Sequence, residues 1–424
     1  MKKREYPAIG ETIHTDTLPN GLSVHVVPKP GFSKSFALFA TNYGGADRRF
    51  RLGGTWCDTP AGVAHFLEHK MFDTPDGGNA LNILSANGAS PNAFTSQGLT
   101  AYHFESTVGF DENLQTLLRF VSVPYFTQES VDKEQGIIGQ EIRMTEDSPD
   151  HAIYVALMRS LYAHNPVRDS VAGTVESIAE IMAQTLYDCH RVFYNPSNMT
   201  LCVVGDVEPA RVLALADETL PGSPGEVPGR DYGPAESALP VTARAEAVMP
   251  VSAPQCLFGA KLVPAAPGTA RLHQTLTGEL ALRCLMGRAS PFYTGLYADG
   301  LLNRDFGVEI DYSAGTATVL AGGESRDPEA VLSALAARVE EVTRVGLDEA
   351  LFRRCQKAMF GGQLRGLGNF GGLAVSLAEG QFAGYCPMDA FAVLESLSAA
   401  ACAAFITETL SSERIALSVV RPSG

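Results

Sequence analysis

A chain of 424 residues is long enough to form two or three domains, each with its own hydrophobic core. Its formal net charge of −15 argues against a protein that binds nucleic-acid phosphates, because such binding needs clusters of Lys and Arg. The sequence predicts neither a membrane span nor a secretory signal, since it contains no long apolar run. We therefore expect a cytoplasmic protein whose eight scattered cysteines are reduced thiols.

The first half of the chain mixes predicted strands and helices without a regular alternation. In chain order, we expect strands at 22–27 and 36–42, a helix around residue 65, a strand at 99–107, helices at 112–121, 130–145, 152–162 and 178–193, and a strand at 200–205. A mixture of this kind predicts an α+β fold, in which helices pack on a largely antiparallel sheet.

The second half of the chain is weakly similar to the first. It opens with a predicted strand at 255–262, followed by a predicted helix at 271–286. Proline and glycine dominate the segment that begins at residue 220, and this composition suits an extended, exposed linker. We therefore expect two homologous modules, 1–220 and 241–424, joined by a Pro/Gly-rich linker at 221–240.

The most informative segment is the pentapeptide His65-Phe66-Leu67-Glu68-His69. Its form, His-x-x-Glu-His, is the inverted zinc-protease signature. Two histidines four residues apart on a helix lie on one face, so both imidazoles can reach one metal ion. Glu68 lies on nearly the same face and could take a proton from a water molecule beside that ion.

The flanks of the pentapeptide also favour a helix. Thr59 and Pro60 can supply its N-cap and first helical residue, and the segment 73–78, rich in Asp, Pro and Gly, can end it. The alternative is a core helix whose histidines only form hydrogen bonds. Two histidines and a glutamate at this spacing make that alternative the weaker one.

Catalytic zinc usually has three protein ligands, so a third donor is needed from elsewhere in the chain. Glu134, Ile137, Ile138 and Glu141 share one helical face, and two carboxylates on such a face need partners. A metal ion with its histidines would be such a partner, and solvated glutamates on a surface helix are the alternative. We prefer Glu141 to Glu146 as the third ligand, because Glu146 lies roughly 140° further round the helix.

These features resemble the pitrilysin/insulinase family of zinc metallopeptidases. The resemblance is carried by residues 62–72 with the pair Glu134 and Glu141, by Leu-Pro-Asn-Gly-Leu at 18–22, Asn-Ala-Phe-Thr at 92–95 with Tyr102, Gly-Thr-Val-Glu at 173–176, Phe-Tyr-Asn-Pro-Ser-Asn-Met at 193–199 and Val-Gly at 204–205. It covers the first half of the chain densely and the second half loosely. The short two-module bacterial members are the nearest group, and the subunits of the mitochondrial processing peptidase are cousins.

The resemblance implies that module 1–220 is catalytic and binds Zn²⁺ through His65, His69 and Glu141. It also implies that Glu68 is the general base and that Glu134 lies beside the metal site, in contact with its ligands. Glu141 follows His69 a little sooner than is usual in the family.

A second implication concerns the peptide substrate. Asn92 and Ala93, with the adjacent Phe94, match the edge-strand segment against which the family lays its substrate as an added strand. This mode of recognition uses main-chain hydrogen bonds and reads few side chains. An ordinary strand end is the alternative for this segment.

The second module departs from the family pattern. Self-sufficient members carry an Arg and, seven residues later, a Tyr that contact the scissile region, whereas here Tyr297 and Arg304 occupy the two positions. The second module also has no His-x-x-Glu-His. We therefore expect a degenerate second module and a homodimer or heterodimer, in which a related two-module chain supplies the missing Arg/Tyr pair.

The sequence thus predicts a zinc-dependent endopeptidase that hydrolyses peptides or unfolded polypeptide segments. The main alternative is a non-catalytic peptide-binding or scaffold subunit of an assembly resembling the processing peptidase, which the missing pair keeps open. A purely structural zinc is disfavoured, because such sites are normally closed by a fourth protein ligand, typically Cys, and only Cys57 lies near the motif.

Overall fold

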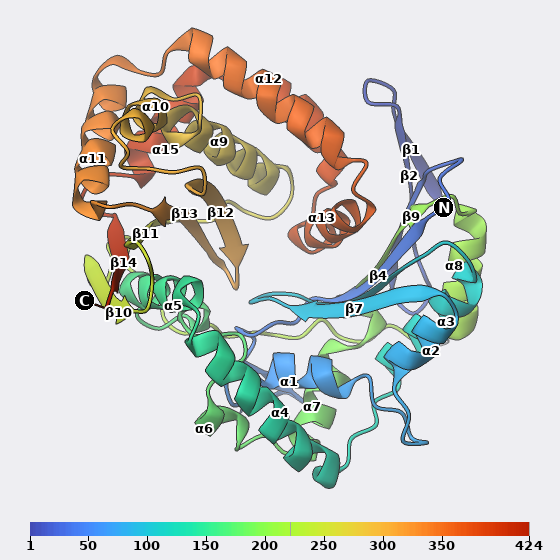
Figure 1. The fold of residues 1–424 in the computed structure, drawn as a ribbon. Helices are drawn as coiled ribbons and strands as arrows, with labels where there is room; N and C mark the ends of the chain where they lie inside the picture. Colours follow the sequence, from blue (N-terminus) through green and yellow to red (C-terminus); the bar gives the residue numbers. More distant parts are fainter. Residues whose placement is uncertain (221, 424) are drawn as a thin grey trace. The chain divides into compact units, whose positions relative to one another are not determined.

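The computed structural model describes every residue except 221 and 424, and the chain forms two compact units, whose elements are labelled in Figure 1. The first unit comprises Met1–Ile142, Ser170–Tyr232 and Leu364–Met388. The second comprises Arg143–Asp169, Gly233–Gln363 and the chain from Asp389 onward. Each unit is therefore assembled from three separate stretches of sequence, and the module boundaries at 220 and 241 stay a prediction.

The first unit is built on a seven-stranded sheet with the order β1-β2-β3-β9-β4-β8-β7. Its strands are β1 Lys2–Tyr6, β2 Glu11–Thr17, β3 Ser23–Pro28, β4 Ser35–Thr41, β7 Ala89–Thr95, β8 Thr100–Ser106 and β9 Met199–Gly205. β3 and β9 are parallel, and every other neighbouring pair is antiparallel. A separate hairpin, β5 Arg49–Leu52 and β6 Thr55–Asp58, precedes the first helix.

Helices cover both faces of this sheet. The helices of the first unit are α1 Val63–Lys70, α2 Ala80–Ala86, α3 Phe110–Ser122, α4 Gln128–Glu146, α6 Val175–Ile178, α7 Ala183–Phe193, α8 Pro209–Thr219 and α13 Phe370–Ala383. One face, on which α1, α3 and α8 pack, carries the core, to which alternate residues such as Val24 and Val26 of β3 contribute. α13 packs on β4 and β9 from the opposite face (Figure 1). Gly371 of α13 lies against the ring of Phe36 there.

The second unit repeats this plan around a five-stranded sheet with the order β10-β14-β11-β13-β12. Its strands are β10 Arg244–Met249, β11 Gln255–Leu262, β12 Gly307–Ser313, β13 Thr316–Glu324 and β14 Ala416–Pro422, and its helices are α5 Pro149–Leu161, α9 Thr269–Met286, α10 Pro291–Ala298, α11 Pro328–Val345, α12 Glu349–Gly366, α14 Ala390–Ser396 and α15 Ala399–Thr409. Only β10 and β14 are parallel among the described strands of this sheet. The predicted α+β class, with largely antiparallel sheets covered by helices, is confirmed.

One predicted helix, 178–193, begins later than predicted. α6 ends at Ile178, and α7 begins at Ala183. The side-chain amide of Gln135 donates to the carbonyls of Ala179 and Ile181, and the side chain of Gln128 accepts the N–H of Ala183. These bonds from α4 satisfy backbone groups that a continuous helix would otherwise pair internally, so the amphipathic pattern was misleading here.

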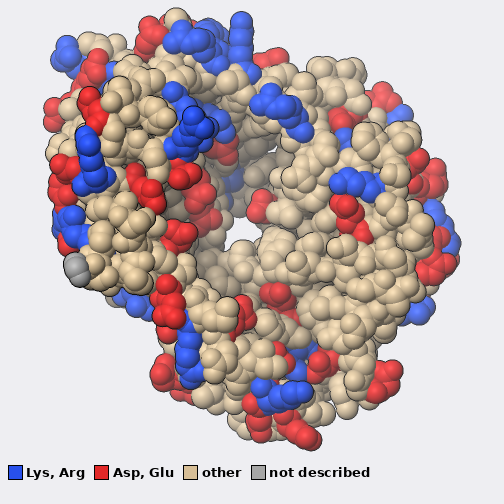
Figure 2. All heavy atoms as spheres, viewed as in Figure 1, with Lys and Arg blue, Asp and Glu red and all other residues tan. Residues whose placement is uncertain are grey.

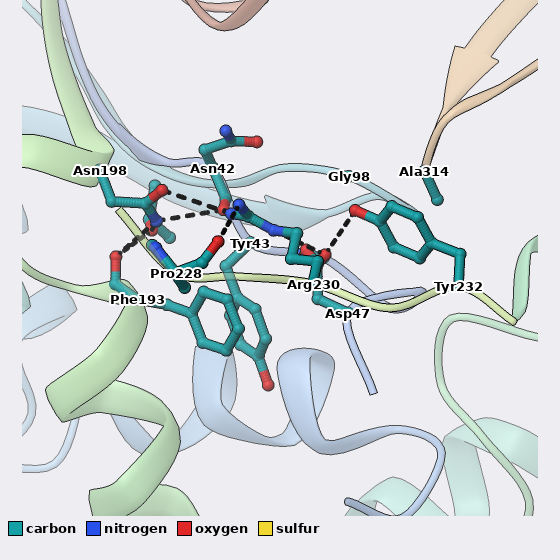
Figure 3. A network of polar contacts seen from close by, with 12 residues as sticks. Asn42, Tyr43, Asp47, Gly98, Phe193, Asn198, Pro228, Arg230, Tyr232 and Ala314 are labelled. Atoms are coloured by element: carbon teal, nitrogen blue, oxygen red, sulfur yellow. Dashed lines mark hydrogen bonds and ion pairs between the residues drawn. The ribbon is translucent and has the colours of Figure 1, made fainter. Parts of the chain in front are cut away.

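Part of the predicted linker is anchored to the first unit (Figure 3). The carboxylate of Asp47 lies 2.9 Å from the Arg230 guanidinium and accepts the Tyr232 hydroxyl at 2.8 Å. Arg230 also donates to the carbonyl of Asn42 and lies over the Phe193 ring. Residues 222–227 are exposed, as the sequence predicts for a linker, but 230–232 are half-buried.

The eight cysteines form no disulfide, as predicted, and six of them are buried. Among the described residues, no single helix has the length and apolar character needed to cross a membrane; a pair bent by 104°, Pro387–Ser396 with Ala399–Thr409, meets both criteria only when taken together. Acidic and basic side chains are interspersed on the face drawn in Figure 2.

Candidate metal centre

The helix that carries the pentapeptide, α1, begins later than the sequence predicts. Thr59 is not its N-cap, because the N–H and the hydroxyl of Thr59 both donate to the carbonyl of Arg48, at 2.8 and 3.1 Å. Gly62 occupies that position with a φ of 96°, and a Cβ there would come within 2.5 Å of the carbonyl oxygen of Ala172. The prediction of a start at Thr59 and Pro60 was wrong because this turn requires a glycine.

α1 buries one side and presents the other to the site. Val63, Phe66 and Leu67 belong to the core of the first unit. His65 and His69, on the other side, keep 13% and 26% of their side-chain surface exposed, and their ring centroids are 4.7 Å apart. The helical spacing of two histidines therefore produces a pair of adjacent imidazoles, as the sequence predicts.

α4 brings both predicted glutamates to these histidines. Ile138 is buried in the core, which turns Glu134 and Glu141 toward α1. Ile137, which the spacing places on the same face, is 49% exposed, so this face is only partly buried. Glu146 is exposed at the end of α4 and does not belong to the group of possible ligands.

His65, His69 and Glu141 form the one group among the described residues that could hold a metal ion. Glu141 Oε1 lies 3.5 Å from His65 Nε2, and Glu141 Oε2 lies 3.5 Å from His69 Nε2. A tetrahedral zinc with ligands at about 2.0–2.1 Å places neighbouring donor atoms about 3.3 Å apart. The donor set and its spacing fit zinc and leave a fourth coordination position open.

Glu134 contacts His69 at Nδ1, the ring nitrogen that faces away from Glu141. Its Oε1 lies 3.2 Å from His69 Nδ1, and its Oε2 lies 3.6 Å from the Lys70 ammonium, which also pairs with Asp73. The bond from His69 lowers the pKa of the Glu134 carboxyl, and a bond from His65 lowers that of Glu141. A carboxylate on Nδ1 leaves Nε2 as the nitrogen that can bind the metal.

The same carboxylates act on His69. Burial disfavours the charged form of His69, but Glu134, Glu141 and Glu68 outweigh it and raise the pKa of His69. A metal ion must therefore compete with a proton for this imidazole, and its binding weakens as the pH falls.

Glu68 is the most buried carboxylate of the group, with 8% of its surface exposed. The hydroxyl of Thr95 donates to Glu68 Oε2 at 2.6 Å. Burial raises the pKa of Glu68, against the opposing effects of the Thr95 bond and of His65 and His69. Glu68 thus lies beside the candidate ligands without belonging to the group that could bind the metal.

The predicted substrate segment lies at the free edge of the larger sheet. β7 is the last strand in the order, and α1 packs against it. Asn92 is exposed and accepts the N–H of Ala93, and the ring of Phe94 lies 6.4 Å from that of His103. The position suits strand addition, but the role of Asn92, Ala93 and Phe94 in substrate binding stays a prediction.

Tyr297 and Arg304 lie in the second unit. Tyr297, on α10, is 45% exposed and stacks on Tyr293 at 5.7 Å between ring centroids. Arg304 is exposed in the loop before β12. Both side chains are therefore accessible, and their part in catalysis stays a prediction.

Sequence reasoning missed the contact between Thr95 and Glu68. The sequence places Thr95 only at the end of the candidate substrate segment, and no local pattern joins it to a residue 27 positions earlier. No sequence signal could have found this contact, because it exists only after β7 and α1 pack together.

Comparison with known proteins finds relatives of both halves of the chain. The family described as insulinase, peptidase family M16, matches residues 53–175, and the family described as peptidase M16 inactive domain matches residues 180–359. YmfH, an uncharacterized zinc protease of Bacillus subtilis, is 36% identical over 433 residues, which is 100% of this chain and 99% of YmfH.

Solved structures give the same result. An M16-like peptidase from Alicyclobacillus acidocaldarius has a TM-score of 0.94 and 34% identity over 99% of this chain and 100% of its own. A protease from Helicobacter pylori shares the fold alone, with a TM-score of 0.82 and 18% identity over 97% of this chain and 99% of its own. This chain belongs to the insulinase (M16) family of peptidases.

Proposed function

We propose that this protein is a zinc-dependent endopeptidase that hydrolyses peptides or unfolded polypeptide segments. The observation that carries the proposal is the convergence of His65, His69 and Glu141: each Nε2 lies 3.5 Å from a Glu141 oxygen, close to the donor spacing of a zinc site, and the three donor atoms lie within 4.8 Å of one another. The family membership and the zinc-protease name of the Bacillus relative support it.

Zinc, when bound by these residues, supplies a Lewis acid that makes water more acidic and polarises the scissile carbonyl. Glu68 then serves as the proton carrier. Its carboxylate takes a proton from the attacking water and returns it to the amine that leaves, a role worth typically 10²–10⁴-fold in rate. The burial of Glu68 suits this role, because a partly dehydrated carboxylate is a stronger base than one in water.

We propose that the substrate binds as an added strand along β7. The free edge of this strand offers main-chain groups to an extended peptide, and Asn92, Ala93 and Phe94 lie along it. Such pairing would hold the peptide bond close to α1, which packs against the same strand.

We also propose that a related chain completes the enzyme. Self-sufficient relatives share an Arg and, seven residues later, a Tyr. This chain has Tyr297 and Arg304 at the two positions, so the pair is absent. A partner with the intact pair would supply that contact to the substrate.

The decisive test compares the zinc-loaded chain with its Glu68→Gln variant on a mixed pool of quenched peptides. We expect cleavage by the first, none by the second, and one zinc per chain in both. Glu129→Gln, which removes an exposed glutamate from α4, is the matched control and should cleave normally. Cleavage by Glu68→Gln at the normal rate, with contamination excluded, would overturn the mechanism.

A further inference from the structure

The hydroxyl of Thr95 occupies a particular place in the site. Thr95 is the last residue of β7, and its Oγ lies 2.6 Å from Oε2 of Glu68. Among the described residues, it is the only hydrogen-bond donor to this carboxylate. Oε1 of Glu68 has no described hydrogen-bond partner. The two oxygens of the proposed general base therefore differ in their surroundings.

The direction of the hydrogen bonds around Thr95 can be assigned. Thr95 pairs across the sheet with Thr100, and their hydroxyl oxygens are 3.2 Å apart. Thr100 donates its single hydroxyl proton to the carbonyl of Tyr43 at 2.9 Å. An ionised Glu68 can only accept, so the proton of Thr95 is directed at Oε2. The bond is charge-assisted, which makes it shorter and stronger than one between neutral groups.

Thr95 is held on a rigid part of the first unit. Thr100 is fully buried, and the ring of Tyr43 stacks on Phe193 at 4.0 Å between centroids. The turn that follows is closed by a 2.7 Å bond from Ser96 N–H to the carbonyl of Leu99. A hydroxyl on such a frame can hold a neighbouring side chain to within about 0.5 Å.

We propose that Thr95 is the positioning residue of the general base: it holds Oε2 of Glu68, so that Oε1 is presented to the attacking water and then to the leaving amine. This inference rests on the proposed function. Thr95 is also part of β7, the strand along which we place the substrate. Thr95 thus connects the general base to the strand beside which the scissile bond would lie.

The first test uses two variants of opposite design. Thr95→Val keeps the shape and removes the hydroxyl, whereas Thr95→Ser keeps the hydroxyl. We expect Thr95→Val to lower kcat by ~10–100-fold with KM and zinc content unchanged, because a displaced base costs rate rather than binding. Thr95→Ser should restore most of kcat. Thr116→Val, which removes a threonine hydroxyl bonded within α3, is the control and should retain activity.

Three results of this test would overturn the proposal. One is a normal kcat in Thr95→Val. Another is an equal loss in Thr95→Val and Thr95→Ser, which would assign the effect to shape. A loss of zinc in Thr95→Val would also contradict it, because Thr95 would then support the metal site and not the base.

A second readout does not depend on activity. In the metal-free protein, we expect Thr95→Val to lower Tm by ~2–4 °C in the wild-type background and to have little effect in the Glu68→Leu background. Equal shifts in both backgrounds would show that the two side chains are not coupled, and the proposal would fall. If the zinc-loaded wild-type chain cleaves no peptide alone, it is incomplete without its partner, and this coupling still decides whether Thr95 holds Glu68.

Discussion

At the scale of single residues, the metal centre depends on the carboxylate behind one of its histidines. Glu134 reaches His69 Nδ1 at 3.2 Å and approaches Lys70, which keeps the carboxylate ionised and in place. A carboxylate in this position fixes the ring of the ligand and raises its basicity. Glu134 should therefore affect how tightly zinc binds without touching it.

We expect Glu134→Ala to weaken zinc binding about 10–100-fold. Glu134→Gln should have a smaller effect, because its amide oxygen can still accept the proton of Nδ1 while the negative charge is lost. Competition with a chelator measures both affinities, with Glu129→Gln as the control. If Glu134→Ala binds zinc as tightly as the wild type, Glu134 is only a surface partner of Lys70.

Some residues of the site could be predicted from the sequence, and Thr95 could not. His65, Glu68 and His69 lie within one turn of a helix, so their relation is set by helical geometry. Glu141 could be chosen over Glu146 by the same geometry. Thr95 could not be assigned its role, because its contact with Glu68 exists only after β7 and α1 pack together.

At the scale of elements, helix interiors were easier to predict than helix ends. The apolar stripe of α1 is local, but its start depends on a carbonyl from Ala172, 110 residues after Gly62 in the chain. The break between α6 and α7 depends likewise on side chains of α4. Both ends are fixed by tertiary contacts, which override local capping signals.

The end of α5 offers a test of such a contact. Glu236, in the linker, accepts the N–H groups of Ala163, His164 and Asn165 at 3.0, 2.7 and 2.8 Å. Burial opposes the charge of this carboxyl, but the three bonds and the nearby Lys261 outweigh burial and lower the pKa of Glu236. One linker carboxylate thus satisfies three backbone donors of the second unit.

Because the folded-state pKa of Glu236 is lowered, its ionised form stabilises the fold above the unfolded pKa of 4.5, and this contribution is lost as the pH falls through the folded value. We expect Glu236→Gln to reduce the free energy of unfolding by about 1–2 kcal/mol at pH 7, and by progressively less below pH 4.5. Thermal unfolding across pH measures the difference. Glu226→Gln, an exposed glutamate of the same linker, should show none; a loss in Glu236→Gln that is independent of pH would contradict this account.

At the scale of the whole molecule, the order of segments along the chain is not the order in which they pack. α13 follows most of the second unit in sequence but packs on β4 and β9 of the first, where Phe370 meets Phe32 at 5.3 Å between ring centroids. Local patterns predicted the α+β class and some of the helices and strands, among them β4, β8, β9 and α3. They could not predict that α13 packs on the sheet of the first unit, because local patterns do not say which sheet an apolar helix face covers.

The need for a partner is also a property of the whole molecule, and the chain itself allows it to be tested. Tyr297 and Arg304 have the right spacing but the reverse order of the pair found in self-sufficient relatives. Both are exposed, so exchanging them should leave the fold intact. We expect the double variant Tyr297→Arg, Arg304→Tyr to raise kcat/KM of the chain alone about tenfold or more, which is ~1.4 kcal/mol of transition-state stabilisation. Each single substitution is a control and should raise it far less, because the pair acts together on the substrate. A wild-type chain that cleaves as fast as the double variant would instead be complete by itself, and the partner would not be needed.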